Sequence, residues 1–355
     1  MCSIPQIEKK LAQSIRLDWE ETLFLYANAS LALLGKWADR INHRKNKELV
    51  FYNKNMHLEP TNHCIFSCRF CSYRANNKGD VWEISLEEML EQIAAKIQDI
   101  TEVHITGGVH PNWDFAYYRK MIAAIRDTFP NLFIKAFSAV EIDVMAKKEK
   151  RAVEEILQSL KEAGLNALPG GGAEIFDAEI RKQICPEKLS GEEWLEIHHK
   201  AHKLGIPSNA TILYAHIEKA EHRIAHLQKL RDMQDETRGF NAFIPLKFKA
   251  ANNALSDLKE AAIVDDLKFF AISRIFLDNF SHIKAYWPML GKENSSIALH
   301  FGVNDIDGTI NDSTKIYSRA GQKEKLSMTE KEIRELILHE GKTPVERDSL
   351  YNVIS

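Results

Sequence analysis

The sequence lacks several features that mark particular classes of protein. It has no apolar run of the roughly 20 residues that a membrane-spanning helix needs, and its first residues, MCSIPQIEKKLAQ, contain no apolar signal-peptide core. The 47 basic and 50 acidic residues nearly cancel, so the net charge of −3 favours neither a nucleic acid nor an anionic membrane as partner. The 355 residues contain no low-complexity segment or short repeat. We therefore expect a cytoplasmic globular protein.

Cysteine is scarce, and its placement is informative. There are five cysteines, and three of them, Cys64, Cys68 and Cys71, lie in the segment 57–74, HLEPTNHCIFSCRFCSYR. In a reducing compartment such a cluster indicates a metal or redox site rather than a disulfide framework. A structural zinc site needs four ligands, and no second cysteine or histidine pair of matching spacing follows. Two interpretations stay open: a cluster with one position left for a substrate, or a structural zinc or iron–sulfur site.

The hydrophobic pattern predicts a fold of alternating strands and helices. Residues 5–45 show helical periodicity and predict a helical N-terminal extension. Short β-branched or apolar runs then alternate with amphipathic runs, which predicts a parallel sheet, and their number favours a (β/α)8 TIM-type barrel over an open, doubly wound sheet. The connection between the last two strands is too short for a full helix. The expected strands are 56–62, 102–108, 132–138, 165–171, 208–214, 240–246, 282–287 and 297–303.

Polar and glycine-rich residues cluster just after the expected strands, and in parallel α/β folds this edge carries the active site. We expect three regions: a helical extension over 1–50, a barrel over 51–320 and a C-terminal helical segment over 321–355 that packs on the barrel. The amphipathic runs 219–238 and 324–342 are interpreted as solvated helices that cover the barrel.

The spacing C-x3-C-x2-C on the loop after a first barrel strand resembles the radical S-adenosylmethionine (radical SAM) superfamily. This resemblance implies that Cys64, Cys68 and Cys71 hold a [4Fe–4S] cluster, and that the amino and carboxylate groups of S-adenosyl-L-methionine (SAM) chelate the fourth iron. The reduced cluster then cleaves SAM to methionine and a 5′-deoxyadenosyl radical. The resemblance also implies an electron donor such as flavodoxin or ferredoxin. A role for Cys185 stays open.

Further segments resemble one branch of this superfamily, the futalosine-pathway enzymes of menaquinone biosynthesis and the deazaflavin (F420 precursor) synthases. They include HITGGVHP, LPGGGAEIF, FIPLKF and FGVNDIDGTI, and together they span 57 to about 310. FIPLKF and NDIDGTI are most similar to the aminofutalosine synthases. That similarity implies a transferase that adds the adenosyl radical to the enol ether 3-[(1-carboxyvinyl)oxy]benzoate, a small aromatic dicarboxylate. The sibling cyclase, a deazaflavin-type enzyme and a non-catalytic metal protein are the alternatives.

The resemblance and the strand-end positions together give the expected site residues. SAM contacts are expected from Phe70, Tyr73, Gly107, Gly108, Ser138, Glu141 and Glu174. Catalytic roles are expected for His216, Asn304 and Asp305, and substrate contacts for Glu218, Arg274 and Asp307. Arg274 is the expected cation for a substrate carboxylate, through bidentate pairing. Ala215 stands where the family usually has glycine, which places the geometry of its loop in question.

Overall fold

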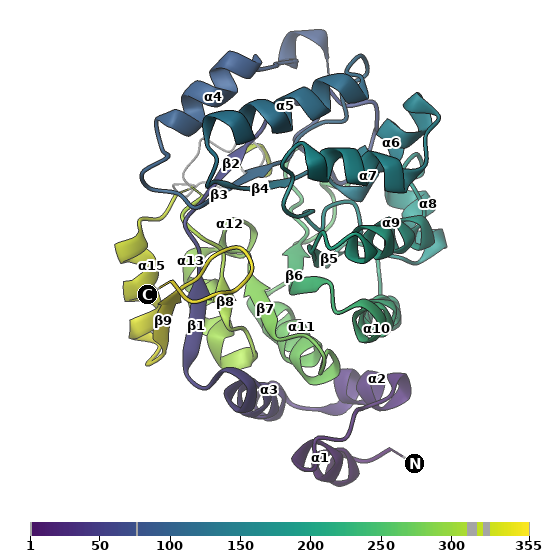
Figure 1. The fold of residues 1–355 in the computed structure, drawn as a ribbon. Coiled ribbons are helices and arrows are strands. Elements are labelled where there is room, and N and C mark those ends of the chain that lie inside the picture. Colours follow the sequence, from purple (N-terminus) through teal and green to yellow (C-terminus); the bar gives the residue numbers. More distant parts are fainter. Residues whose placement is uncertain (1, 76, 311–317, 322–326, 355) are drawn as a thin grey trace.

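The structure, a computed structural model, describes residues 2–75, 77–310, 318–321 and 327–354. Its named strands all pair in parallel and form two sheets, in the orders β5-β6-β7-β8-β1-β9 and β2-β3-β4 (Figure 1). The strands are β1 (Leu49–Tyr52), β2 (Asn55–Leu58), β3 (Glu102–Ile105), β4 (Phe133–Ala136), β5 (Ser208–Tyr214), β6 (Phe240–Lys247), β7 (His282–Ala285), β8 (Asp305–Ile306) and β9 (Thr343–Glu346).

The two sheets join into a barrel at two places. On one side β1 pairs with β8 while β2, which follows β1 after two residues, pairs with β3, so the chain from 49 to 58 belongs to both sheets. On the other side, single bridges from Ala167 to Lys135 and from Leu168 to Ser208 link β4 to β5. The predicted α/β barrel is confirmed. The expected fourth strand is present only as these bridges, because the glycine-rich segment that follows leaves the sheet at once.

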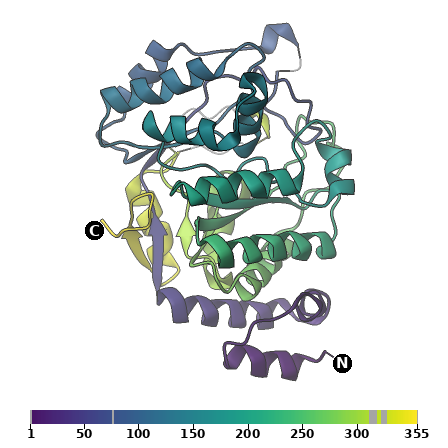
Figure 2. The same cartoon turned by 45° about the vertical axis from the view of Figure 1, so that its right-hand side comes forward.

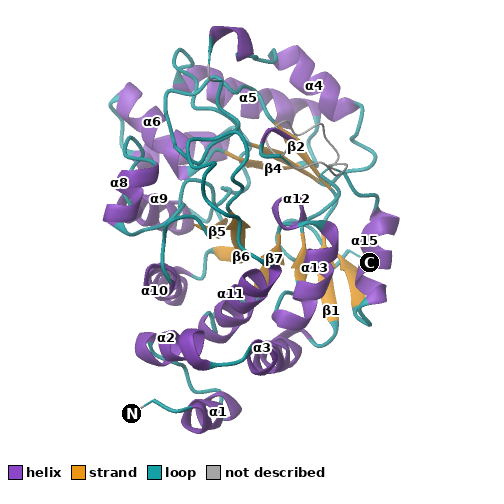
Figure 3. Cartoon of the chain, turned by 180° about the vertical axis from the view of Figure 1, so that it is seen from behind, coloured by secondary structure: helices purple, strands orange, loops and turns teal. Residues whose placement is uncertain are grey.

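Helices surround the strands, as Figures 2 and 3 show. The N-terminal helices α1, α2 and α3 lie outside the barrel, where α2 and α3 pack on α10 and α11. The principal helices are α1 (Ile4–Ala12), α2 (Trp19–Asn28), α3 (Leu31–Asn46), α4 (Leu86–Ala94), α5 (Phe115–Thr128), α6 (Ala139–Glu149), α7 (Val153–Glu162), α8 (Ala178–Ile184), α9 (Gly191–Lys203), α10 (Ala220–Thr237), α11 (Ile263–Phe276) and α15 (Glu330–His339).

The end of the barrel differs from the prediction. The run 297–303 is not a strand: α13 (Lys292–Ala298) and the 3₁₀ helix η2 (Leu299–Phe301) cover most of it, after the short α12 (Trp287–Leu290). Its apolar side chains Ala298 and Leu299 are fully buried, and η2 packs on α3 and α11. The eighth strand is instead β8, a few residues later. Short apolar runs fit a helix as well as a strand, and packing against α3 and α11 makes this run helical.

The C-terminal segment contains more than a helix. After α15, β9 pairs with β1 along its whole length, from Leu49 with Thr343 to Tyr52 with Glu346. The following residues turn back, and Arg347 bridges Val353. The expected boundary at 320/321 is flanked by residues 311–317 and 322–326, which lie outside the described part of the chain. Within the described residues, no helix is long and apolar enough to span a bilayer.

Candidate functional site

The loop that follows β2 carries the three clustered cysteines, and backbone hydrogen bonds fix its course. The amide of Ile65 donates to the carbonyl of Val109 at 2.9 Å, and the amide of Arg69 donates to the carbonyl of Ile184 at 2.8 Å. The amide of Val109 also donates to the Sγ atom of Cys64, at 3.3 Å. The cysteine loop is therefore anchored to the ends of β3 and α8, with one thiol already accepting a backbone N–H.

The chemistry of this donor set fits an iron–sulfur cluster. Burial raises the pKa of the Cys64 thiol, and burial raises the pKa of the Cys68 thiol to about 12. The free thiols of Cys64 and Cys68 would therefore stay protonated at neutral pH and would become ligands only by exchanging their protons for a metal. Cys185 is buried at the end of α8 rather than on this loop. Three thiols on one loop can hold a [4Fe–4S] cluster and leave one iron without a protein ligand.

Gly107 and Gly108 follow β3 and pass very close to the cysteine loop. A Cβ atom at Gly107 would lie 2.9 Å from the Thr61 carbonyl oxygen, and one at Gly108 would lie 2.7 Å from the His63 carbonyl oxygen. The amide of Gly108 donates to the Thr61 carbonyl at 2.7 Å. Glycine is therefore required for the approach of two backbone segments. The predicted contact of these glycines with SAM remains a prediction.

A cavity of about 300 Å3 lies beside the cysteine loop, at the carboxyl ends of the strands. Five of the predicted residues line it, namely Phe70, Cys71, Tyr73, Ser138 and Glu174. Much of the remaining wall is apolar, formed by Leu213, Ile244, Leu246, Phe248, Tyr286 and Met289. Five residues predicted for the site thus lie around one cavity at the carboxyl ends of the strands, and their roles remain predictions.

Lys188, which sequence reasoning missed, lies between two of these residues. Its Nζ atom pairs with Oε1 of Glu174 at 2.7 Å and lies 5.3 Å from the centre of the Phe70 ring. Burial lowers the pKa of Lys188, but its ion pair with the Glu174 carboxylate opposes that shift, and the net pKa is well above the ordinary value. A cation is therefore held beside the cysteine loop. Lys188 precedes a helix rather than following a strand, so the strand-end rule does not find it.

Ser138 and Glu141 form a capping box at the start of α6. The backbone N–H and the hydroxyl of Ser138 both donate to Oε2 of Glu141, at 2.7 and 2.8 Å. Burial raises the pKa of Glu141 to about 7, although the two hydrogen bonds from Ser138 oppose that shift. Ser138 lines the cavity and Glu141 does not. The structure therefore gives the Glu141 carboxylate a helix-capping contact, and the predicted contact with the SAM ribose stays a prediction.

His216 and Glu218 lie in the turn after β5, outside the cavity lining. The Glu218 carboxylate accepts the His216 amide at 2.8 Å and pairs with Arg223 at 2.6 Å. The Nδ1 atom of His216 lies 3.2 Å from Oε2 of Glu218. Ala215, which opens this turn, has φ = +69°, the left-handed conformation that glycine adopts without strain. In the described structure both predicted residues stabilise this turn, and the His216 ring lies 6.4 Å from the ring of the cavity-lining Phe248.

Arg274 and Asn304 lie away from the cavity and contact each other. The Arg274 guanidinium is fully buried and donates to the carbonyls of Gly302, Phe280 and Ser281. Its remaining nitrogen donates to Oδ1 of Asn304 at 2.7 Å. Burial lowers the pKa of Arg274 to about 9. Since protein acceptors occupy the guanidinium, the geometry gives no support to the predicted substrate contact of Arg274 or to the predicted catalytic role of Asn304.

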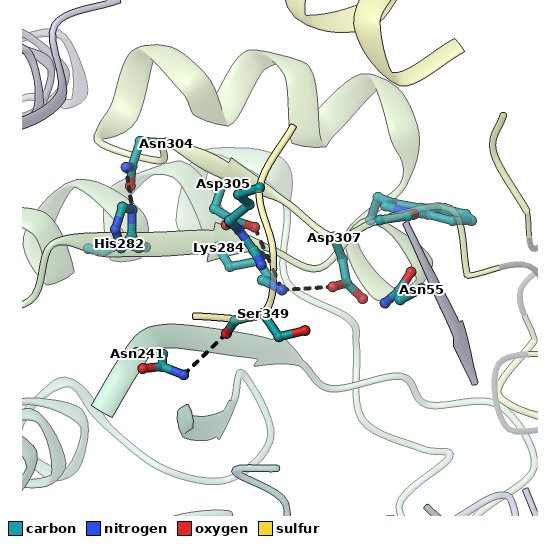
Figure 4. Close-up of polar contacts among 12 residues, drawn as sticks. Asn55, Asn241, His282, Lys284, Asn304, Asp305, Asp307 and Ser349 are labelled. Carbon is teal, nitrogen blue, oxygen red and sulfur yellow. Dashed lines mark hydrogen bonds and ion pairs between the residues drawn. The ribbon is translucent and has the colours of Figure 1, made fainter. Parts of the chain in front are cut away.

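Asp305 and Asp307 belong to a buried ionic network inside the barrel, which we call the floor network and which includes Glu102 and Asp305, the first residues of β3 and β8. Figure 4 shows Lys284 of this network between Asp305 and Asp307. Lys284 lies 2.8 Å from Asp307 and 3.6 Å from Asp305. Arg347, from the C-terminal turn, pairs with Asp305 at 2.7 Å. The floor network comprises Glu102, Lys135, Lys284, Asp305, Asp307, Arg347 and Ser349.

The position of the floor network follows from the shift of the eighth strand. Asp305 is the first residue of β8, rather than a residue beyond its end, so its side chain meets Lys284 of β7 inside the barrel. The geometry therefore does not place the predicted catalytic Asp305 or the predicted substrate ligand Asp307 in the cavity. Asp307 comes nearest, because its Oδ2 atom lies 3.8 Å from His57, whose ring packs on the cavity-lining His104.

Comparisons with known proteins agree with this geometry. Residues 58–230 match the Radical SAM superfamily, and residues 237–355 match the CofH/MqnC C-terminal region. The chain is 40% identical over 98% of its length, and 95% of the relative's, to the aminodeoxyfutalosine synthase of Thermus thermophilus. It is 37% identical over 95% of its length, and 85% of the relative's, to the cyclic dehypoxanthine futalosine synthase of Streptomyces coelicolor.

More distant relatives share only the fold. The crystal structure of methylornithine synthase (PylB) superposes with a TM-score of 0.75 at 16% identity, covering 95% of this chain and 97% of that one. The structure of the hydrogenase maturase HydG from Carboxydothermus hydrogenoformans superposes with a TM-score of 0.77 at 18% identity. The match covers 98% of this chain and 80% of that one. With a cysteine loop, a barrel cavity and these relatives in agreement, the chain belongs to the radical SAM superfamily, in the group with the CofH/MqnC C-terminal region, a membership that implies a [4Fe–4S] cluster and SAM.

Proposed function

We propose that this chain transfers the 5′-deoxyadenosyl group of SAM to 3-[(1-carboxyvinyl)oxy]benzoate in menaquinone biosynthesis. SAM, the enol ether and water give 6-amino-6-deoxyfutalosine, methionine, bicarbonate and a proton, so the net reaction consumes no electron. The adenosyl carbon forms a bond to the enol-ether double bond, and the vinyl carboxylate leaves as bicarbonate after rearrangement. SAM is therefore a co-substrate whose adenosyl group ends in the product.

The observation that carries this proposal is the cavity beside Cys71. Part of its wall is formed by the cysteine loop, and much of the rest is apolar or aromatic. Such a wall suits an aromatic substrate placed against the adenosyl group. The 40% identity to an aminodeoxyfutalosine synthase along nearly the whole chain supports the particular reaction. Relatives with other reactions reach similar identity, including a 5-amino-6-(D-ribitylamino)uracil–L-tyrosine 4-hydroxyphenyl transferase of Archaeoglobus fulgidus at 38% over 89% of the chain and 92% of that protein.

The residues divide by position into a cluster end and a substrate end. Cys64, Cys68 and Cys71 would hold the cluster, which when bound supplies the single electron that cleaves SAM. Phe70, Tyr73, Ser138 and Glu174 line the cavity and are assigned to SAM, with Gly107 and Gly108 keeping the loop in place. Tyr73 is held by its hydroxyl, which donates to the Thr61 carbonyl at 3.0 Å. The apolar wall around Phe248 and Tyr286 is assigned to the aromatic substrate.

The test follows the fate of the adenosyl group. Cluster-loaded, reduced protein is incubated with SAM labelled in the adenosyl carbons and with the enol ether, and the products are analysed by mass spectrometry. The proposal predicts that the label appears in 6-amino-6-deoxyfutalosine. Label found only in free 5′-deoxyadenosine would contradict it and favour the cyclase or deazaflavin-type reaction. Protein that carries zinc without sulfide would favour a non-catalytic metal protein.

A further inference from the structure

The lining of the cavity carries few charged side chains. Among the described side chains that line it, one ammonium group is present, that of Lys249, and one carboxylate, that of Glu174. Glu174 is already paired with Lys188 at 2.7 Å. Lys249 lies two residues beyond the end of β6, at the edge of the barrel where the cysteine loop also lies. An anionic ligand in this cavity would therefore meet the charge of Lys249.

The contacts of Lys249 leave part of its hydrogen-bonding capacity available. Its Nζ atom pairs with Oε2 of Glu260 at 2.7 Å, and Oε1 of Glu260 accepts the Ala250 amide at 3.2 Å. An ammonium group has three N–H donors, and in the described structure the Nζ atom has this single acceptor. The side chain of Lys249 is 17% exposed and that of Glu260 34% exposed. Glu260 thus holds the lysine in position while two donors can face a ligand.

Two other cations of the barrel cannot take this role, because protein acceptors hold them outside the cavity lining. Lys247, on the same strand, donates to Asp266 and to the Ala261 carbonyl, both at 2.7 Å. Arg274 donates to three backbone carbonyls and to Asn304. Lys249 therefore takes the place that the sequence had suggested for Arg274.

We propose that Lys249 binds the carboxylate of an aromatic acid, with the ring lying against the apolar wall that includes Leu246 and Phe248. This inference rests on the proposed function and names the group that selects its substrate. The enol ether carries two carboxylates, and one of them leaves during the reaction. A cation on the leaving carboxylate would stabilise the ground state and oppose its departure, whereas a cation on the benzoate carboxylate stabilises substrate and transition state equally. Lys249 is accordingly assigned to the benzoate carboxylate.

Binding without turnover tests this assignment. Cluster-loaded protein is titrated calorimetrically, in the presence of SAM and without reductant, with the enol ether and with two analogues. One analogue, 2-phenoxyacrylate, lacks the benzoate carboxylate, and the other, 3-(vinyloxy)benzoate, lacks the vinyl carboxylate. In Lys249→Met, the Kd for the enol ether and for 3-(vinyloxy)benzoate should rise about tenfold to hundredfold, the usual range for a lost charged hydrogen bond. The Kd for 2-phenoxyacrylate should barely change.

Two control variants separate binding from a structural role of the ion pair. Lys259→Met removes an exposed lysine from the same loop and should leave all three Kd values unchanged. Glu260→Gln keeps the acceptor for the Ala250 amide but removes the competing charge, so binding should stay the same or tighten. If Glu260→Gln weakened binding as much as Lys249→Met, the pair would only hold the loop, and the proposal would be wrong.

The remaining outcomes are also decisive. Equal affinities of wild type and Lys249→Met for 3-(vinyloxy)benzoate, or no binding of any of the three ligands by wild type, would overturn the assignment. Weaker binding of SAM itself in Lys249→Met, with both analogues affected alike, would assign Lys249 to the methionine carboxylate instead. Adenosyl transfer is measured separately after reduction. Lys249-dependent binding without adenosyl transfer would retain the carboxylate site and reject the proposed function.

Discussion

The two ends of the barrel use charge in opposite ways. At the carboxyl ends of the strands, the cavity wall is largely apolar, with the charge of Glu174 neutralised by Lys188 and that of Lys249 shared with Glu260. At the other end, the floor network packs three carboxylates and three cations together with Ser349 in the described part of the barrel interior. The cavity leaves hydrogen-bonding capacity for ligands, whereas the floor network satisfies its charges internally.

This difference shows that a polar residue near a strand predicts a cavity position only when the residue at which the strand ends is known. Cys71 and Glu174 follow the ends of their strand segments and line the cavity. Asp305 opens its strand and pairs with Arg347 instead. A shift of a few residues in one strand thus moves a predicted catalytic group from the edge of the cavity to an ion pair inside the barrel.

The largest effect is predicted for a substitution at the cavity end of the barrel that leaves the floor network intact. Cys68→Ala removes one of three cluster ligands, so bound iron and sulfide should be lost and SAM cleavage abolished, as measured by metal analysis and methionine release. Cys185→Ala, which removes a buried thiol outside the cysteine loop, is the matched control and should keep the cluster. SAM cleavage by Cys68→Ala at the wild-type rate would contradict the ligand assignment.

The next largest effect is predicted for a substitution in the floor network that leaves the cavity lining intact. Arg347→Met leaves the buried Asp305 with Lys284, at 3.6 Å, as its one remaining cation among the described residues. This should cost about 3–5 kcal/mol in the free energy of unfolding, measured by denaturant titration of the cluster-free chain. Adding Asp305→Asn removes the unpaired charge and should restore much of the loss. A double variant no more stable than Arg347→Met would show that charge pairing is not the reason. The folded fraction should still bind the cluster.

A pH-dependent effect is expected at the capping box of α6, on the cavity side. The pKa of Glu141 is raised by burial to about 7, so between about pH 4.5 and 7 the unfolded chain loses this proton while the folded chain keeps it. The contribution of Glu141 to stability therefore falls as the pH rises through this window. Glu141→Gln does not titrate, and its stability relative to wild type should rise by up to about 3 kcal/mol from pH 4.5 to 7. A difference that is constant across this range would contradict the raised pKa.

The smallest effect concerns the turn after β5. Ala215→Gly removes the steric cost of φ = +69°, partly offset by the greater freedom of glycine in the unfolded chain, for a net gain of about 0.5 kcal/mol in unfolding free energy. Ala210→Gly, on the neighbouring strand β5, is the control and should destabilise, since alanine there is buried in the sheet. Destabilisation by both changes would mean that Ala215 is not strained.

The sequence predicted the barrel and the cysteine loop because both depend on local patterns: alternating apolar periods and thiols at close spacing. The starts of α4 and α9 depend on equally local patterns, the capping boxes of Ser85 with Glu88 and of Ser190 with Glu193. The sequence did not predict β1 and β9, whose four-residue runs are too short for a periodic signal and depend on each other for pairing.

Contacts between side chains far apart in the chain could not be predicted from the sequence either. Nothing local indicates that Lys188 meets Glu174 or that Arg347 meets Asp305, 42 residues away, because the fold alone brings them together. Lys249 was within reach of the strand-end rule, since it follows β6 directly. The predicted substrate contact of Arg274 gains no support, because its buried guanidinium donates to three backbone carbonyls and to Asn304, which sequence does not reveal.

Electron paramagnetic resonance of the reduced, cluster-loaded protein, recorded with and without SAM, tests most directly whether the cysteine loop holds a cluster with one iron open to SAM. The three-thiol donor set predicts a [4Fe–4S] signal whose shape changes when SAM is added, because SAM becomes a ligand of the fourth iron. A cluster signal that is identical in the presence and absence of saturating SAM would contradict that assignment.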